Sequence, residues 1–214
     1  MGTEPVVDEP KWLLWARELQ ALAQTGLTFS ENQYDLDRFR RVRAIAIEML
    51  AHGADAPVER LVGLFEQDVG YPTPKVDVRG AVFRDEHILL VREVSDGRWT
   101  LPGGWADVNQ SAKECVEREV WEESGFQARA VKLAAVWDRR RQAPTPTHHP
   151  YSIYKLFFIC ELIGGAARTS LETDAVEFYT LEQLPPLSTG RTTARQIERM
   201  FAHQRDRALM TEFD

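Results

Sequence analysis

The chain has 214 residues, of which 43% are hydrophobic, and it carries a formal net charge of −7. This size allows a medium domain and a smaller one to bury a core. The negative charge disfavours a protein that binds nucleic acid by neutralising phosphates, and without an apolar run of about eighteen residues no membrane span is expected. Residues 1–10 lack the apolar core of a secretory signal. The two cysteines suggest buried thiols in a reducing, cytoplasmic compartment.

The first predicted elements are helices between Lys11 and Phe65. Hydrophobic residues recur at helical spacing in two stripes, which are Trp12, Trp15, Leu19 and Leu22, and then Leu36, Phe39, Val42, Ile45 and Met49. We expect Gly26 to interrupt the first helix, Asp35 to start the second, and Val58–Phe65 to form a third. Each residue of these stripes is expected to be ordinary core, but a short helical unit rarely buries two such stripes alone. It is therefore expected to pack on the second domain or on a second copy of the chain.

Strands are predicted after a proline-rich linker, Gly70–Pro74, whose prolines block a continuing helix. We accordingly divide the chain into a helical domain, 1–70, and a mixed domain, 71–214. Residues 76–81 alternate apolar and polar side chains, which predicts a half-buried strand. The apolar run Ile88–Val91 predicts the next strand, and Asp96-Gly97 is a hairpin signal.

A glycine loop and a helix follow. Pro102, Gly103 and Gly104 lie in a stretch where the backbone can approach a ligand closely. Ser111–Glu114 has the capping-box pattern, so a helix should start near Ser111 and end at Gly125. Small apolar residues give this helix a stripe that can pack on a sheet; they are Ala112, Cys115, Val116 and Val120.

Three carboxylates lie on one sector of that helix. Glu119, Glu122 and Glu123 stand at positions i, i+3 and i+4, where like charges repel and destabilise a bare helix. A common use of such a cluster is to hold a hard divalent cation such as Mg²⁺ through oxygen ligands, which suggests chemistry on phosphates. The alternative is a solvated, salt-bridged helix face.

The remaining chain predicts strands over 131–137 and 153–162, an end of the sheet region at Leu184–Pro186, and a final helix over Thr192–His203. The basic run Arg139–Arg141 can grip an anion or form a solvated turn. Two histidines, His148 and His149, lie in the loop 144–150, where no acids or cysteines stand at metal-binding spacing. A lid over the substrate is the favoured role for this loop.

Residues Gly104–Phe126 resemble the Nudix box, Gly-x5-Glu-x7-Arg-Glu-U-x-Glu-Glu-x-Gly-U, where U is a bulky aliphatic or aromatic residue. The matching positions are Gly104, Arg118, Glu119, Val120, Glu122, Glu123, Gly125 and Phe126. One position departs, because Gln110 stands where the box has its first Glu. In the family that Glu mainly pairs with the box arginine, so we expect a weaker contact to Arg118 and no loss of the site.

The Nudix resemblance implies a fold and a set of site residues. The fold is an α/β (α+β) class α/β/α sandwich with a mixed sheet, here preceded by the small helical domain. Glu119 and Glu123 should be the main ligands of Mg²⁺, with Mn²⁺ as the alternative metal. Glu122 should assist, the carbonyl of Gly103 should be a further ligand, and Arg118 should orient the glutamates.

Several other segments resemble a Nudix subgroup that has a helical N-terminal extension and includes a CDP-choline pyrophosphatase. They are Trp12–Arg41, Tyr71–Arg79, Gly103–Val108 and Pro150–Lys155. This resemblance implies a homodimer that hydrolyses a small nucleoside diphosphate derivative, with CDP-choline as the first expectation. ADP-ribose or another nucleotide sugar is the second. A Nudix domain that binds a nucleotide as a sensor, without cutting it, is the third.

Further site residues are expected around the acidic cluster. Glu172 is a candidate general base, although it also fits a solvated loop, and Glu122 or Glu123 can take the same role. Arg79 is a candidate to clamp a phosphate bidentately, or is an exposed strand residue. Trp105 and Tyr151 are candidates to stack on a nucleobase, or they pack within the protein.

Overall fold

The structure, a computed structural model, describes residues 10–54, 57–66, 69–142 and 149–214. They form two units. The helical unit contains the described residues up to Pro74 together with 149–152, and the sheet unit contains 75–142 and 153–214. Most of the predicted lid, including His148, and nearly all of the acidic N-terminal stretch lie outside the described residues. No helix among the described ranges is long and apolar enough to cross a membrane.

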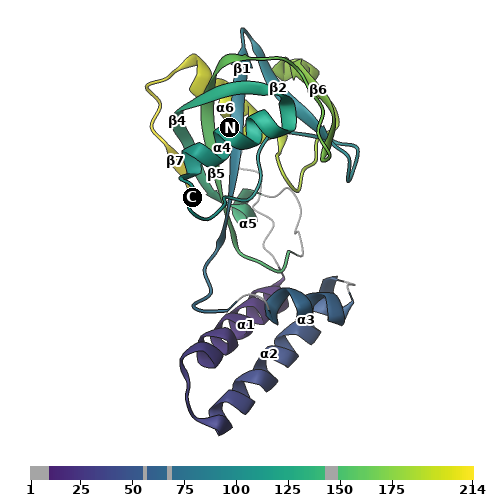
Figure 1. The fold of residues 1–214 in the computed structure, drawn as a ribbon, viewed down its shortest axis with the longest axis vertical. Helices are drawn as coiled ribbons and strands as arrows, with labels where there is room; N and C mark the ends of the chain where they lie inside the picture. The colour runs from purple at the N-terminus through teal and green to yellow at the C-terminus, as the bar shows by residue number, and fades with distance from the viewer. Residues whose placement is uncertain (1–9, 55–56, 67–68, 143–148) are drawn as a thin grey trace. The chain divides into compact units, whose positions relative to one another are not determined.

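The helical unit consists of α1 (Lys11–Phe29), α2 (Gln33–Ala54) and α3 (Val58–Glu66) (Figure 1). The expected break at Gly26 is wrong, because α1 continues through it. A Cβ atom at Gly26 would lie 2.4 Å from the ring of Phe39 on α2. The glycine therefore allows the two helices to approach. Helix α2 begins two residues before the predicted Asp35, and Asn32 accepts a hydrogen bond from the Tyr34 amide at 2.9 Å.

The apolar stripe predicted on α1 is buried only in part, since Trp12 packs partly buried against the core of the unit. Trp15 and Leu22 are 55% and 58% exposed, whereas the buried positions are Leu13, Ala16, Gln20, Ala23 and Gln24. Alanine leaves room for a close neighbouring helix, and the bulky tryptophan does not. The core of this unit joins Leu13 and Ala16 to residues of α2 and α3, which are Ile47, Leu50, Ala51, Leu61 and Phe65.

The sheet unit contains seven strands and three α-helices among its described residues. In chain order they are β1 (Lys75–Arg84), β2 (His87–Glu93), β3 (Trp99–Thr100), α4 (Ala112–Ser124), β4 (Phe126–Asp138), α5 (Arg139–Gln142), β5 (Ile153–Gly165), β6 (Thr173–Tyr179), the 3₁₀ turn η1 (Leu181–Gln183), α6 (Ala194–Arg205) and β7 (Glu212–Phe213). The sheet order is β3-β2-β1-β5-β4-β7, with β6 paired to β2. Strand β1 runs parallel to β5, and β4 to β7, while the other pairs are antiparallel.

Helices cover both faces of this mixed sheet (Figure 1). On one face α4 packs on β1 and β5 through a cluster that contains Val116, Val120, Val78 and Cys160. On the other face α6 contributes Ile197, Met200 and Phe201 to a second cluster. The predicted α/β/α sandwich is confirmed.

Cys115 and Cys160 are both buried free thiols, as expected.

Two strand predictions need correction. Strand β1 is buried on both faces from Asp77 to Phe83, and not half-buried, because β2 and β5 flank it and helices cover it above and below. The sheet also does not end at Leu184–Pro186, because the chain returns after α6 and adds the short strand β7 beside β4.

Candidate active site

Helix α4 is fixed at both ends by its sequence. At its start, the Ser111 hydroxyl accepts a hydrogen bond from the Glu114 amide at 3.2 Å. The Glu114 carboxylate in turn accepts from the Ser111 amide at 2.8 Å, which completes the predicted capping box. At its end, Gly125 adopts a left-handed conformation with φ of 74°, which suits glycine. The acidic residues are therefore carried on a helix of defined length.

A glycine lets α4 lie directly on the sheet. A Cβ atom at Gly80 of β1 would stand 2.6 Å from Val120 Cγ2 and 3.2 Å from Val116 Cγ2. Both distances are shorter than ordinary contacts between carbon atoms. The absence of a side chain at Gly80 thus sets how closely the helix and its carboxylates approach β1.

The glycine loop runs along β1 and meets α4. The Val78 amide donates to Gly104 O at 2.8 Å, and the Gly80 amide donates to Pro102 O at 2.9 Å. Gly103 has φ of 140°, and a Cβ atom there would lie 2.0 Å from Val78 O, so only glycine fits. Its amide donates to Glu123 Oε2 at 2.9 Å. The loop and the acidic helix are therefore joined through Glu123.

A cavity of about 510 Å³ opens over these elements, a size typical of small-molecule sites. It brings together most of the predicted site residues. Its lining residues are Gly104, Trp105, Asp107, Arg118, Glu119, Glu122, Glu123, Ser170, Leu171 and Glu172. Trp105, one of these lining residues, is 47% exposed.

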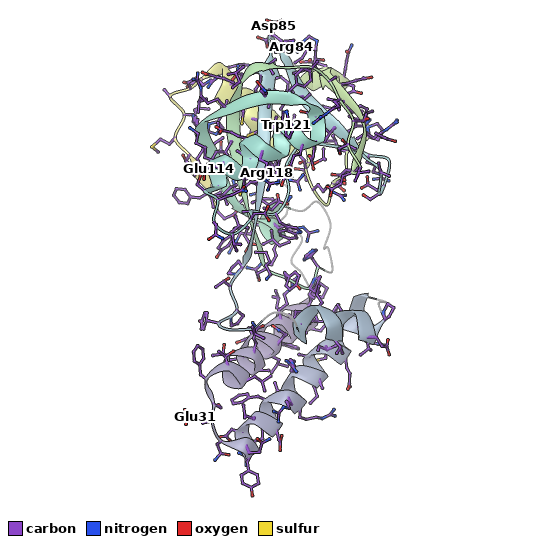
Figure 2. All side chains as sticks on the ribbon, in the orientation of Figure 1. Glu31, Arg84, Asp85, Glu114, Arg118 and Trp121 are labelled. Atoms are coloured by element: carbon purple, nitrogen blue, oxygen red, sulfur yellow. The ribbon has the colours of Figure 1, made fainter. Side chains whose placement is uncertain are left out.

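Arg118 connects the acidic side chains. Its guanidinium lies 3.0 Å from Glu119 Oε1 and 2.6 Å from Glu122 Oε2. It also donates to Asp107 at 2.7 Å and, through Nε, to Gln110 Oε1 at 3.1 Å. The expected contact between Gln110 and Arg118 is therefore present, made by an amide carbonyl. Figure 2 shows Arg118 between Glu114 and Trp121 along α4.

Burial makes the charge on two of the carboxylates costly. Burial raises the pKa of Glu123 to about 8, although Arg79 and the Gly103 amide act in the opposite direction. Burial likewise raises the pKa of Glu119, partly offset by Arg118. A bound cation would stabilise both ionised forms.

The donor set fits a hard cation, with one rearrangement. Within the described ranges, no three His, Cys, Asp or Glu side chains already surround a single point as metal ligands do. The reason is local, because Arg118 engages Glu119 and Glu122 while Glu123 accepts from Gly103. The three carboxylates nevertheless line one cavity, and carboxylate oxygens are the ligands that Mg²⁺ takes. A bound cation would replace Arg118 as the partner of Glu119 and Glu122.

Arg79 lies behind the cavity wall. It is 4% exposed, and its Nε and Nη2 atoms donate to the two oxygens of Asp77, each at 2.9 Å. Its Nη1 atom donates to Leu101 O at 3.1 Å, at the start of the glycine loop. These bonds use three of the five N–H groups of the guanidinium. The predicted phosphate clamp stays a prediction, whereas the alternative of an exposed strand residue is wrong, because Arg79 is buried.

A buried charge network surrounds this pair. Lys155 lies 3.5 Å from Asp77 Oδ1 and also donates to the Arg191 carbonyl. Burial alone would raise the pKa of Asp77, but Arg79 and Lys155 outweigh it, so that pKa lies below its ordinary value. Burial lowers the pKa of Lys155 to about 7.

The structure places the other candidates elsewhere. Tyr151 belongs to the helical unit, where the centroid of its ring lies 5.7 Å from that of Phe65 in an edge-on contact, a geometry that fits the packing alternative. The basic run forms the short helix α5, in which Arg140 pairs with Asp138 at 2.6 Å, as in the solvated-turn alternative. Sequence reasoning missed three residues of the cavity wall, which are Asp107, Ser170 and Leu171. Only Asp107 carried a signal, its position just after the glycine loop.

Comparison with known proteins supports the resemblance over the whole chain. Residues 10–65 match the family model described as a UDP-X-like N-terminal oligomerisation domain. Residues 73–201 match that of the NUDIX domain. The Bacillus subtilis (strain 168) protein named "Putative ADP-ribose pyrophosphatase YjhB" is 40% identical over 206 residues, which is 96% of this chain and 98% of that protein.

Two solved structures extend this result. An ADP-ribose pyrophosphatase from Streptococcus suis 89-1591 is 41% identical, with a TM-score of 0.61, and the match covers 66% of this chain and all of that one. A UDP-X diphosphatase is 31% identical, with a TM-score of 0.61, over 95% of this chain and 98% of that one. The chain therefore belongs to the Nudix family of pyrophosphohydrolases, in the group that carries an N-terminal oligomerisation domain.

Proposed function

We propose that this protein is a Mg²⁺-dependent hydrolase of the diphosphate linkage in ADP-ribose or a related nucleotide sugar. The observation that carries the proposal is the cavity in which Glu119, Glu122 and Glu123 of α4 meet the glycine loop. The names of the relatives support ADP-ribose and UDP-linked substrates and give CDP-choline no support. The first expectation from the sequence therefore gives way to the second.

Glu119, Glu122 and Glu123 would hold the metal, with the Gly103 carbonyl as a further ligand. Bound Mg²⁺ supplies neutralisation of the diphosphate charge and a more acidic water molecule. Before the metal binds, Arg118 holds Glu119 and Glu122 at the cavity through its two ion pairs. Mn²⁺ has the same preference for oxygen ligands and should substitute.

Glu172 is the proposed general base. It lies on a segment of the cavity wall separate from α4, so its carboxylate is free of the metal-binding task assigned to the helix. A carboxylate there can take a proton from the attacking water, provided that it comes within hydrogen-bond reach. Trp105 is the proposed stacking surface for the nucleobase, since an exposed aromatic ring can bind the face of any base.

We also propose that the helical unit forms a homodimer. Its described surface carries large apolar side chains that a monomer would leave in water; they include Trp15, Leu22, Phe29 and Tyr34, each more than half exposed. Exposed apolar groups of this size mark interaction surfaces, and the matching family model describes an oligomerisation domain.

A substrate panel tests the proposed function. ADP-ribose, UDP-glucose and CDP-choline are incubated with the protein and Mg²⁺, and nucleoside monophosphate release is measured by chromatography. The proposal predicts release of AMP or UMP that stops when EDTA is added. Turnover of CDP-choline alone would reinstate the first expectation. Tight binding of a nucleotide with no release from any compound would support the sensor instead.

A further inference from the structure

We propose that Thr173 is a positioning residue that fixes the segment 166–172, and with it Glu172, to the carboxyl end of the metal-binding helix. This inference rests on the proposed function only for its kinetic consequence. The structural part stands on the hydrogen bonds of the segment, which joins β5 to β6 and contributes Ser170, Leu171 and Glu172 to the cavity wall.

The central contact is a single buried hydrogen bond. Thr173 is 0% exposed, and its hydroxyl donates to the backbone carbonyl of Glu123 at 2.6 Å. Nearby, the Arg168 amide donates to Ser124 O at 2.9 Å. The last four carbonyls of a helix have no partner within the helix. Here Thr173 supplies a partner to one of them, on Glu123, and Arg168 of the segment supplies a partner to the next, on Ser124.

A second set of bonds carries this constraint to Glu172. The Thr173 and Ser170 hydroxyls lie 3.0 Å apart, and Ser170 Oγ accepts from the Glu172 amide at 3.1 Å. The Ser170 amide donates to Thr173 O at 2.9 Å. On the other side, the Val94 amide donates to Glu172 O at 2.8 Å. The backbone of Glu172 is thus held between Val94, the residue after β2, and the end of α4.

Close packing of backbone supports the same arrangement. A Cβ atom at Gly125 would meet Ala166 O at 2.5 Å and Arg168 Cβ at 2.6 Å. The end of α4 and the start of the segment are therefore in direct contact. The Arg168 guanidinium also lies 4.9 Å from the ring of Trp121 on α4. Thr173 completes this junction at the end nearest Glu172.

The test compares Thr173→Val, which keeps the shape but removes the hydroxyl, with Thr173→Ser, which keeps the hydroxyl. Thr211→Val is the matched control, because the Thr211 hydroxyl also donates to a backbone carbonyl, Leu133 O, at 2.7 Å. Hydrogen exchange of the amides in 166–172 is measured without substrate. We expect roughly tenfold faster exchange in Thr173→Val, a rate near wild type in Thr173→Ser, and no change in this segment in Thr211→Val.

Kinetics then test the link to Glu172. Thr173→Val should lower kcat about ten- to a hundredfold, as a misplaced catalytic group does, with little change in KM, and Thr173→Ser should restore it. In the Glu172→Gln background, Thr173→Val should cost no more than about a further twofold, because residues that act as one unit are not additive. If Thr173→Val fails to fold, Ser170→Ala replaces it, because that change loosens the same bonds from the segment side.

Several results would overturn the proposal. The first is an unchanged rate of amide hydrogen exchange in 166–172 of Thr173→Val. The second is that Thr173→Val and Glu172→Gln lower kcat by factors that multiply in the double variant. The third is a Glu172→Gln enzyme with full activity. Failure of the proposed function has a different signature. In that case the wild-type protein cleaves no diphosphate, and the exchange experiment, which needs no substrate, still decides whether Thr173 fixes the segment.

Discussion

Replacing Asp77 by Ala should destabilise the protein far more than the loss of one surface ion pair. Asp77 and Arg79 are 7% and 4% exposed, and two hydrogen bonds of 2.9 Å join them. Without Asp77, Lys155 can shed its charge because burial has already lowered its pKa to about 7. Arg79 cannot, since a guanidinium stays protonated. An unpaired buried charge remains, and such losses cost about 3–5 kcal/mol of unfolding free energy.

Urea denaturation followed by circular dichroism measures this loss. With an m-value of about 2 kcal/mol/M, the midpoint should fall by about 2 M. The matched control is Asp174→Ala in the same unit, because the Arg92–Asp174 pair is as short, at 2.7 Å, but its side chains are 41% and 49% exposed. Its midpoint should barely move. Equal, small shifts of the urea midpoint in the two variants would refute the reasoning that loss of Asp77 is costly because the Asp77–Arg79 pair is buried.

The remaining predictions concern other parts of the sheet unit. Because the pKa of Lys155 is about 7 when folded and about 10.5 ordinarily, the unfolded chain binds more protons between these pH values, so the unfolding free energy should rise with pH there. Lys155→Met should flatten that rise in urea titrations at pH 7, 8 and 9, and an unchanged slope would contradict the assignment. Gly80→Ala should cost about 1–3 kcal/mol by overpacking α4 and should lower kcat. The control is Gly63→Ala in the helical unit, where an added Cβ meets nothing within 4 Å, and it should neither lower stability nor lower kcat. Equal melting temperatures of Gly80→Ala and Gly63→Ala would contradict the close packing of α4 on Gly80. Gln110→Glu should raise kcat by about twofold, since an ionised acceptor strengthens the bond to Arg118; a lower kcat would argue that the amide is preferred.

Local signals in the sequence predicted the core of the site. The capping box at Ser111, the left-handed Gly125 and the spacing of Glu119, Glu122 and Glu123 are all properties of neighbouring residues, and each appears in the structure. The pattern of the Nudix box also predicted that the glycine loop, residues 102–104, belongs to the site. These features depend on helix geometry, which sequence spacing encodes directly.

Contacts between residues far apart in the chain could not be predicted from the sequence. Alternation along β1 could not tell whether one or both faces of the strand are covered, so the burial of Arg79 against Asp77 was not foreseen. The bond from Thr173 to Glu123 joins residues fifty positions apart, and no motif marks it. On α1, hydrophobicity favoured Trp15, whereas the helix contact selected small residues such as Ala16.

The most direct test of the account is turnover by Glu119→Gln with ADP-ribose and Mg²⁺. The control is Glu117→Gln on the same helix. The Glu117 side chain accepts a hydrogen bond from the Ala130 amide at 2.8 Å, and glutamine keeps an oxygen that can accept it. AMP release should fall at least about 100-fold in Glu119→Gln, as expected when support of a bound metal is lost, with an unchanged melting midpoint, while Glu117→Gln stays near wild type. Wild-type turnover in Glu119→Gln would contradict the assignment of these carboxylates to the metal.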